Sequence, residues 1–92
     1  MVKIINNDIL RDDRKIGYLN GNQVWSHDGK KLGFFEDNHI YDHDARKVAY
    51  IEGEFLYDEG GNKKARIEEV MESVEGILSD LGRCAIYILL GN

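Results

Sequence analysis

The sequence reads NGNQVWSHDGKKLGFF from Asn20 to Phe35, and the same sixteen-residue pattern returns as EDNHIYDHDARKVAYI (Glu36–Ile51) and as EGEFLYDEGGNKKARI (Glu52–Ile67). An earlier copy, ILRDDRKIGYL (Ile9–Leu19), aligns with these three if one turn residue is deleted. Repeats of this kind bury their apolar faces by packing on one another. They therefore specify an architecture, and they name no reaction.

Each copy contains two short apolar and aromatic runs separated by turn residues. One kind of turn occurs at Asp28-Gly29, Asp44-Ala45 and Gly60-Gly61, and a second kind occurs at Asn20-Gly21, Glu36-Asp37 and Glu52-Gly53. Two-residue turns with such compositions provide positive φ angles and match the twist of antiparallel strands. The pattern predicts antiparallel β-hairpin repeats of period 16 with about seven strands.

Pairing across two-residue turns predicts two rows of side chains on opposite faces of the hairpins. One row is largely aromatic and aliphatic: Ile16, Trp25, Leu32, Tyr41, Val48 and Tyr57. The other has a small residue in every second strand: Gly17, Val24, Gly33, Ile40, Ala49 and Leu56. Because glycine in a strand marks the close approach of another backbone, we expect the small row to face the centre of radially arranged hairpins. The aromatic row would then be buried. An ordinary twisted meander is the alternative.

The C-terminal third has a different pattern. Apolar residues recur with helical spacing from Ile67 to Leu81, which predicts one amphipathic helix over 66–82. The following run, CAIYILLGN, predicts a terminal strand over 84–90. An unpaired apolar strand is a template for association. We therefore expect a homo-oligomer whose interface contains the residues of this strand: Ile86, Tyr87, Ile88, Leu89 and Leu90.

These elements together predict an α+β, mostly β, single domain over 1–92, with the hairpin repeats over 6–67. The chain has 17 acidic and 12 basic residues, and this net charge of −5 argues against binding to nucleic acid. The chain has a single cysteine, no apolar run of signal-peptide length near its start and no stretch long enough to cross a bilayer. These features favour a cytoplasmic protein without membrane contact.

The candidate sites are weak. If the hairpins converge, four turn residues could form a carboxylate–imidazole cluster for a metal: Asp12, His27, His43 and Glu59. Such residues are also ordinary in solvated turns, so we expect no metal and no cofactor. The basic pairs beside the turns are expected to form local ion pairs. Cys84 lies in an apolar run, which predicts an inert thiol. Since no catalytic motif is visible, we expect that the protein is not an enzyme.

The segments LNGNQVWSHDGKKLGFF (Leu19–Phe35) and HIYDHDARKVAYIEGEFLYDEGGN (His39–Asn62) resemble the bacterial four-fold beta flower domain and, more distantly, MORN-like repeats. The resemblance covers roughly Ile9 to Ile67. It implies hairpins arranged about a central axis, an uncharacterised activity and no catalytic residues. Lys64 and Arg66 stand where the pattern has an aliphatic and an aromatic residue, so we expect the last return strand to be short or absent.

The sequence therefore predicts a non-catalytic structural or protein-interaction module that self-associates. The alternative is a small-ligand or metal-binding domain that uses the polar residues of the hairpin turns.

Overall fold

The computed structural model describes residues 1–91. Within them, ten strands form one sheet in the order β10-β1-β2-β3-β4-β5-β6-β7-β8-β9, accompanied by two helices. The α+β, mostly β prediction is confirmed. The first six strands are β1 (Val2–Ile5), β2 (Asp8–Arg11), β3 (Arg14–Asn20), β4 (Gln23–Ser26), β5 (Lys31–Glu36) and β6 (His39–Asp42). The other four are β7 (Lys47–Glu52), β8 (Phe55–Asp58), β9 (Lys63–Arg66) and β10 (Val74–Glu75).

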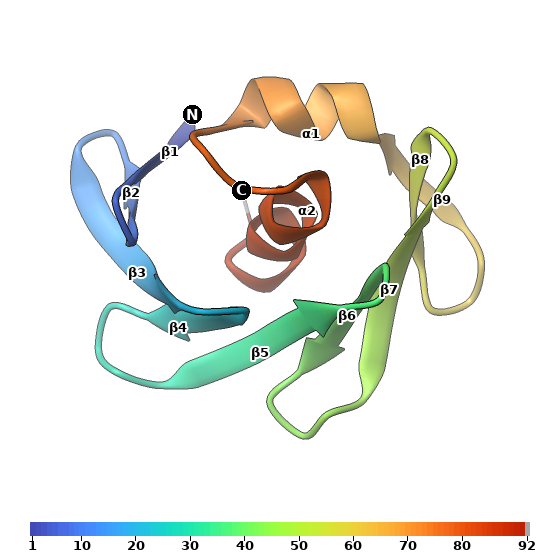
Figure 1. Ribbon diagram of the computed structural model, residues 1–92, viewed down its shortest axis with the longest axis horizontal. Helices are drawn as coiled ribbons and strands as arrows, with labels where there is room; N and C mark the ends of the chain where they lie inside the picture. Colours follow the sequence, from blue (N-terminus) through green and yellow to red (C-terminus); the bar gives the residue numbers. More distant parts are fainter. Residues whose placement is uncertain (92) are drawn as a thin grey trace.

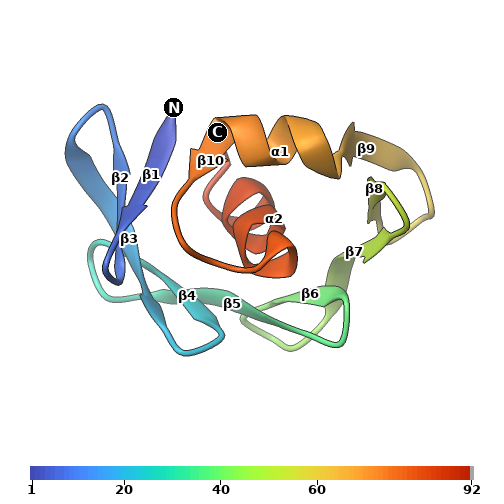
Figure 2. The ribbon, with the colours of Figure 1, turned by 45° about the horizontal axis from the view of Figure 1, so that its top comes forward.

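The sheet curls around a central helix (Figure 1). Helix α2 (Asp80–Leu89) lies inside the curl and packs against β4, β5 and β6. Helix α1 (Ile67–Ser73) bridges the opening between β9 and the β10–β1 side of the sheet, and it contacts α2 (Figure 2). The buried side chains form one apolar cluster between the concave face and the two helices.

Two kinds of turn alternate along the sheet. The hairpins β1–β2, β3–β4, β5–β6 and β7–β8 close with two-residue turns, and Asp37 and Asn38 in the third have φ values of 51° and 67°. This type I′ geometry matches strand twist, and Asn tolerates positive φ. The turns predicted at Asn20-Gly21, Glu36-Asp37 and Glu52-Gly53 were each wrong by one residue. Consequently Phe35 pairs with Ile40, whereas a turn at Glu36-Asp37 would have paired Ile40 with Gly33.

Three of the other four hairpins, β4–β5, β6–β7 and β8–β9, close with longer loops. The Ser26 N–H donates to the Lys30 carbonyl at 2.8 Å, so three residues separate the pair, and the third of them, Gly29, has φ 85°. The equivalent third positions, Ala45 and Gly61, have φ 63° and 83°. The β2–β3 loop consists of only two residues, Asp12 and Asp13. It is one residue shorter than the equivalent loops, and this difference is the one-residue deletion that aligning the first repeat required.

Each of the hairpins β2–β3, β4–β5, β6–β7 and β8–β9 contains a β-bulge on its second strand. In each of the strands β3, β5, β7 and β9, one residue has no pairing partner in the preceding strand. These residues are Ile16, Leu32, Val48 and Lys64. A bulge bends its strand and increases the local twist. Four bulges at one repeat position therefore curl the sheet.

The small row faces inward, as predicted, but helix α2 occupies the centre that we expected the hairpins to share. All six residues of this row are buried: Gly17, Val24, Gly33, Ile40, Ala49 and Leu56. A Cβ atom built on Gly33 would lie against the Tyr41 carbonyl oxygen and 2.9 Å from Leu89 Cδ1. The glycines thus let α2 approach the sheet closely.

The aromatic row was predicted wrongly. All six residues of this row are partly buried, but only Ile16, Leu32 and Val48 pack against the core, whereas Trp25, Tyr41 and Tyr57 do not. In each strand these rings follow an inward residue, and successive strand side chains point to opposite faces. The rings therefore lie on the convex, outer face of the sheet.

The C-terminal assignment also needs correction. The helix predicted over 66–82 ends at Ser73, and Val74–Glu75 forms β10, which pairs in parallel with β1. Gly76 then has φ 142°, and Ile77 is fully exposed at 101%. Residues 74–77 do not continue the helix, because they form an edge strand of the sheet and then a turn that reverses the chain direction.

The terminal strand predicted over 84–90 is part of helix α2. Ser79 starts this helix by accepting a hydrogen bond from the Gly82 N–H at 3.0 Å. A helix satisfies its backbone internally, so an apolar one fits inside the curled sheet without an edge to pair with. Ile86 is 1% exposed, and Tyr87, Ile88, Leu89 and Leu90 pack against the core. The unpaired strand on which the expected interface depended does not exist.

The expected shortening of the last return strand is confirmed. Strand β9 has 4 residues, whereas the return strand β7 has 6. The bulge position holds the exposed Lys64, and α1 begins directly after Arg66.

We predict that Gly33→Val prevents folding or sharply lowers the melting temperature, because the side chain would overlap the Tyr41 carbonyl and Leu89. Circular dichroism during heating measures this. The matched control is Gly21→Asn in an open turn with φ 59°, where Asn is tolerated. A Gly33→Val protein that melts like the wild type would contradict the close approach of α2.

We predict opposite effects for two isoleucines of the C-terminal third. Ile86→Ala should lower the free energy of unfolding by about 2–5 kcal/mol because Ile86 is buried on α2. Ile77→Ala should change it by less than about 0.5 kcal/mol because Ile77 is exposed. Urea denaturation measures both. Equal effects would contradict the division of this segment into β10, a turn and α2.

Candidate functional site

The interior of the curled sheet has no polar lining. Among residues 1–91, every fully buried side chain of the core is apolar or is the Cys84 thiol. Burial raises the pKa of Cys84 to about 12, so this thiol is not a nucleophile at neutral pH. Functional chemistry must therefore lie on the outside of the molecule.

The four residues considered as metal ligands do not come together. Asp12, His27, His43 and Glu59 are exposed and lie in four different loops, which point outward at separate places on the periphery (Figure 1). The described part of the chain contains no group of three or more His, Cys, Asp or Glu residues placed to hold a metal. Sequence spacing suggested a column, but the outward splay of the hairpins separates its members.

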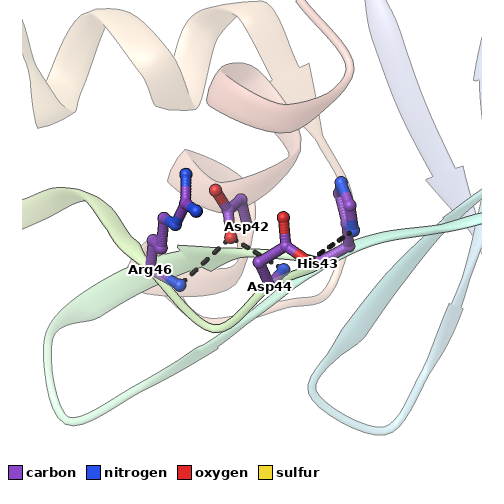
Figure 3. A network of polar contacts seen from close by, with 4 residues as sticks. All are labelled: Asp42, His43, Asp44 and Arg46. Atoms are coloured by element: carbon purple, nitrogen blue, oxygen red, sulfur yellow. Dashed lines mark hydrogen bonds and ion pairs between the residues drawn. The ribbon is translucent and has the colours of Figure 1, made fainter.

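One polar residue before each longer loop supports the loop backbone. Asp42 accepts hydrogen bonds from the N–H groups of Asp44 at 2.8 Å and Arg46 at 3.0 Å (Figure 3). The Arg46 N–H, followed by that of Asp44, holds the pKa of Asp42 below its usual 3.8. Asp58 accepts in the same way from Asn62 at 2.9 Å. These carboxylates build loops and are not available as an acid–base pair.

The outer face of the sheet carries three stacked aromatic pairs, one between each two successive repeats. The ring centroids of Tyr18 and Trp25 are 6.0 Å apart, those of Phe34 and Tyr41 4.6 Å, and those of Tyr50 and Tyr57 5.1 Å. The planes of each pair lie within 8–11° of parallel. Such cross-strand pairs stabilise a sheet, and their outer edges remain accessible.

His39 links the second and third of these pairs, and Phe55 extends the third. The His39 ring lies 6.3 Å from Tyr41 and 6.1 Å from Tyr50, and Phe55 lies 6.3 Å from Tyr57. We call this surface the outer aromatic face; it consists of Tyr18, Trp25, Phe34, His39, Tyr41, Tyr50, Phe55 and Tyr57. All eight side chains are partly exposed.

A row of lysines borders the outer aromatic face. Lys15 Nζ lies 5.2 Å from the Tyr18 ring centroid, Lys31 Nζ 5.1 Å from Phe34 and Lys63 Nζ 4.0 Å from Phe55. With Lys47, these residues occupy the same position in all four repeats, and we call them the lysine row. Sequence analysis missed this face because it assigned Trp25 and Tyr41 to the buried side. The signal that could have found it is the sixteen-residue spacing of Tyr18, Phe34 and Tyr50.

Two acidic hollows lie beside the β7–β8 turn. A hollow of about 610 Å³ is lined by residues that include Asp37, His39 and Glu52. A second of about 210 Å³ is lined by residues that include Glu54, Arg66, Glu68 and Asp80, and the two share Gly53. We call their five carboxylates the acidic rim: Asp37, Glu52, Glu54, Glu68 and Asp80.

Comparison with known proteins gives a family match. A family model described as 4-fold beta flower protein matches residues 1–79. The match extends beyond the Ile9–Ile67 region of the resemblance and ends immediately before α2. No curated protein and no solved structure matches the chain. Over residues 1–91, no helix has both the length and the apolar character needed to cross a membrane.

We predict that Asp42→Ala destabilises the β6–β7 loop at neutral pH but removes part of the acid sensitivity of the protein. The pKa of Asp42 is lower in the folded protein than its usual 3.8. The Asp42 carboxylate therefore stabilises the fold fully above pH 3.8, and this stabilisation is lost as the pH falls through the folded-state pKa. Denaturation between about pH 2 and 6 measures this. Asp44→Ala is the control, since no backbone N–H of the described loop donates to that carboxylate. Equal pH profiles for wild type and Asp42→Ala would contradict this role.

Proposed function

The chain belongs to the 4-fold beta flower proteins, and we propose that it is a non-catalytic structural or protein-interaction module that self-associates. The observation that supports this proposal is the outer aromatic face, which is partly exposed on a sheet whose other face is filled by α2. Aromatic residues are enriched in protein interfaces because they bury large areas with little loss of conformational freedom.

The association we propose uses the face of the sheet and not its edges. Edge strand β9 carries Lys63, Lys64 and Arg66, and charged side chains on an edge oppose pairing with another strand. At the other edge, Arg83 Nη1 donates to the Val74 carbonyl at 3.2 Å, so this acceptor of β10 is already engaged. With α2 enclosed and both edges opposed to pairing, we propose that the outer aromatic face is the surface that binds a partner.

The same geometry argues against the other partners considered. Each stacked ring has one face against its neighbour, and lysines lie over Tyr18 and Phe34, so few ring faces remain for stacking on nucleobases. The net charge of −5 opposes phosphate binding as well. A free, buried thiol is compatible with a reducing compartment, and we propose a cytoplasmic location.

The small-ligand alternative has less support. Its candidate residues, Asp12, His27, His43 and Glu59, are separated on four loops, and His43 has its own neighbour, the Asp44 carboxylate at 3.4 Å. An interaction surface requires no convergence of these residues. We therefore keep the interaction module as the proposed function.

Sedimentation analysis tests the proposal. We predict that the wild-type protein forms oligomers between about 1 and 100 μM and that the double variant Phe34→Thr/Tyr50→Thr dissociates to a monomer in this range. Threonine retains strand propensity while removing the rings. The matched control is Ile77→Thr, which removes an exposed apolar side chain outside the outer aromatic face. A wild-type monomer throughout this range would refute self-association.

A further inference from the structure

We infer that the copies associate head to tail: the acidic rim of one copy contacts the lysine row and outer aromatic face of the next. This inference depends on the proposed self-association and specifies its partner surface. It is drawn from the separation of charge along the hairpins and from the scarcity of ion pairs within one copy.

The acidic rim concentrates negative charge from several elements. Its carboxylates come from the β5–β6 turn, the end of β7, the β7–β8 turn, α1 and the start of α2. Among the residues lining the two hollows, Arg66 is the only permanent cation, against five carboxylates. A cationic surface that covered the rim would relieve the repulsion between these carboxylates.

The lysine row lies at the opposite end of the same strands. Lys47 begins β7 and Glu52 ends it, and five residues of strand span about 17 Å. This is about twice the screening length of ~8 Å at physiological salt, so the two ends neutralise each other only weakly. The charges of the rim and the row are therefore available to another molecule.

Contacts within the chain leave most of the row without an anionic partner. The described residues contain two ion pairs, and only Lys15, which lies 3.1 Å from Asp8, belongs to the row. The local ion pairing expected for the basic pairs is thus largely not formed. Loop carboxylates near the row keep their negative charge, but those of Asp42 and Asp58 accept loop N–H groups, that of Asp28 accepts from the Ser26 hydroxyl, and none of the three forms an ion pair with a lysine of the row.

Charge complementarity selects a contact between two different surfaces. Two rows placed face to face would repel, and so would two rims, which opposes a two-fold dimer through either surface. A row-to-rim contact is attractive, and it leaves a free rim on one copy and a free row on the other. Such heterologous contacts repeat until they close into a ring or extend into a filament.

A charge-reversal mixing experiment tests this arrangement. The rim variant is Asp37→Lys/Glu52→Lys, and the row variant is Lys31→Glu/Lys47→Glu. We expect each variant alone to self-associate at least ~10-fold more weakly than wild type, measured by sedimentation. When the two are mixed, the reversed row should bind the reversed rim, so that sedimentation shows a species containing both variants. We also expect wild-type association to weaken as salt is raised.

Controls separate this inference from the proposed function. Glu72→Lys reverses an exposed charge on α1 outside the rim and should associate like wild type. If the wild type associates but both variants associate equally well, the head-to-tail arrangement is overturned and self-association through the aromatic rings stands. If each variant is weakened but mixing restores nothing, the row and rim do not contact each other. If the wild type is monomeric, the proposed function itself fails.

Discussion

The packing of α2 against the concave face of the sheet is the contact on which the rest of the structure depends. Ten short strands curl but do not close, so their apolar inner face needs another element to exclude water. Glycine permits this contact on both sides. Gly33 of the sheet leaves space for Leu89, and a Cβ atom on Gly82 of the helix would lie 3.1 Å from Phe35 Cζ. The short distance between the sheet and α2 therefore depends on these two glycines, which have no side chain.

Filling the interior with a helix moves any functional surface to the outside. The repeat then has two roles in each strand, because alternate side chains face α2 and solvent. Inward positions carry small and aliphatic residues, whereas outward positions carry paired rings and lysines. One sixteen-residue pattern thus produces a uniform core and a uniform outer surface. The acidic rim breaks this uniformity where β9 gives way to α1, because Glu54, Glu68 and Asp80 meet there.

The recurring bulge explains both the curvature of the sheet and the main error of the sequence-based prediction. Counting across two-residue turns pairs Trp25 with Leu32, but the bulge makes Lys31 the partner of Trp25. Leu32 is thereby released to pack against the core, and the ring of Trp25 stays outside with Tyr18. Because a bulge depends on the twist that the whole sheet adopts, the local sequence pattern does not reveal it.

The sequence by itself determined the hairpin repeats, the alternation of two kinds of turn and the inward direction of the row that contains Gly17, Gly33 and Ala49. These features depend on contacts between neighbouring strands and on φ angles that only a few residue types adopt readily. Only the tertiary structure decided that residues 84–90 belong to a helix and that the rings form an outer face beside a lysine row. The β-rich residues Ile86 and Ile88 prefer a strand in isolation, but the curled sheet offers them an enclosed apolar space without a free edge, and a helix fits that space because it satisfies its own backbone.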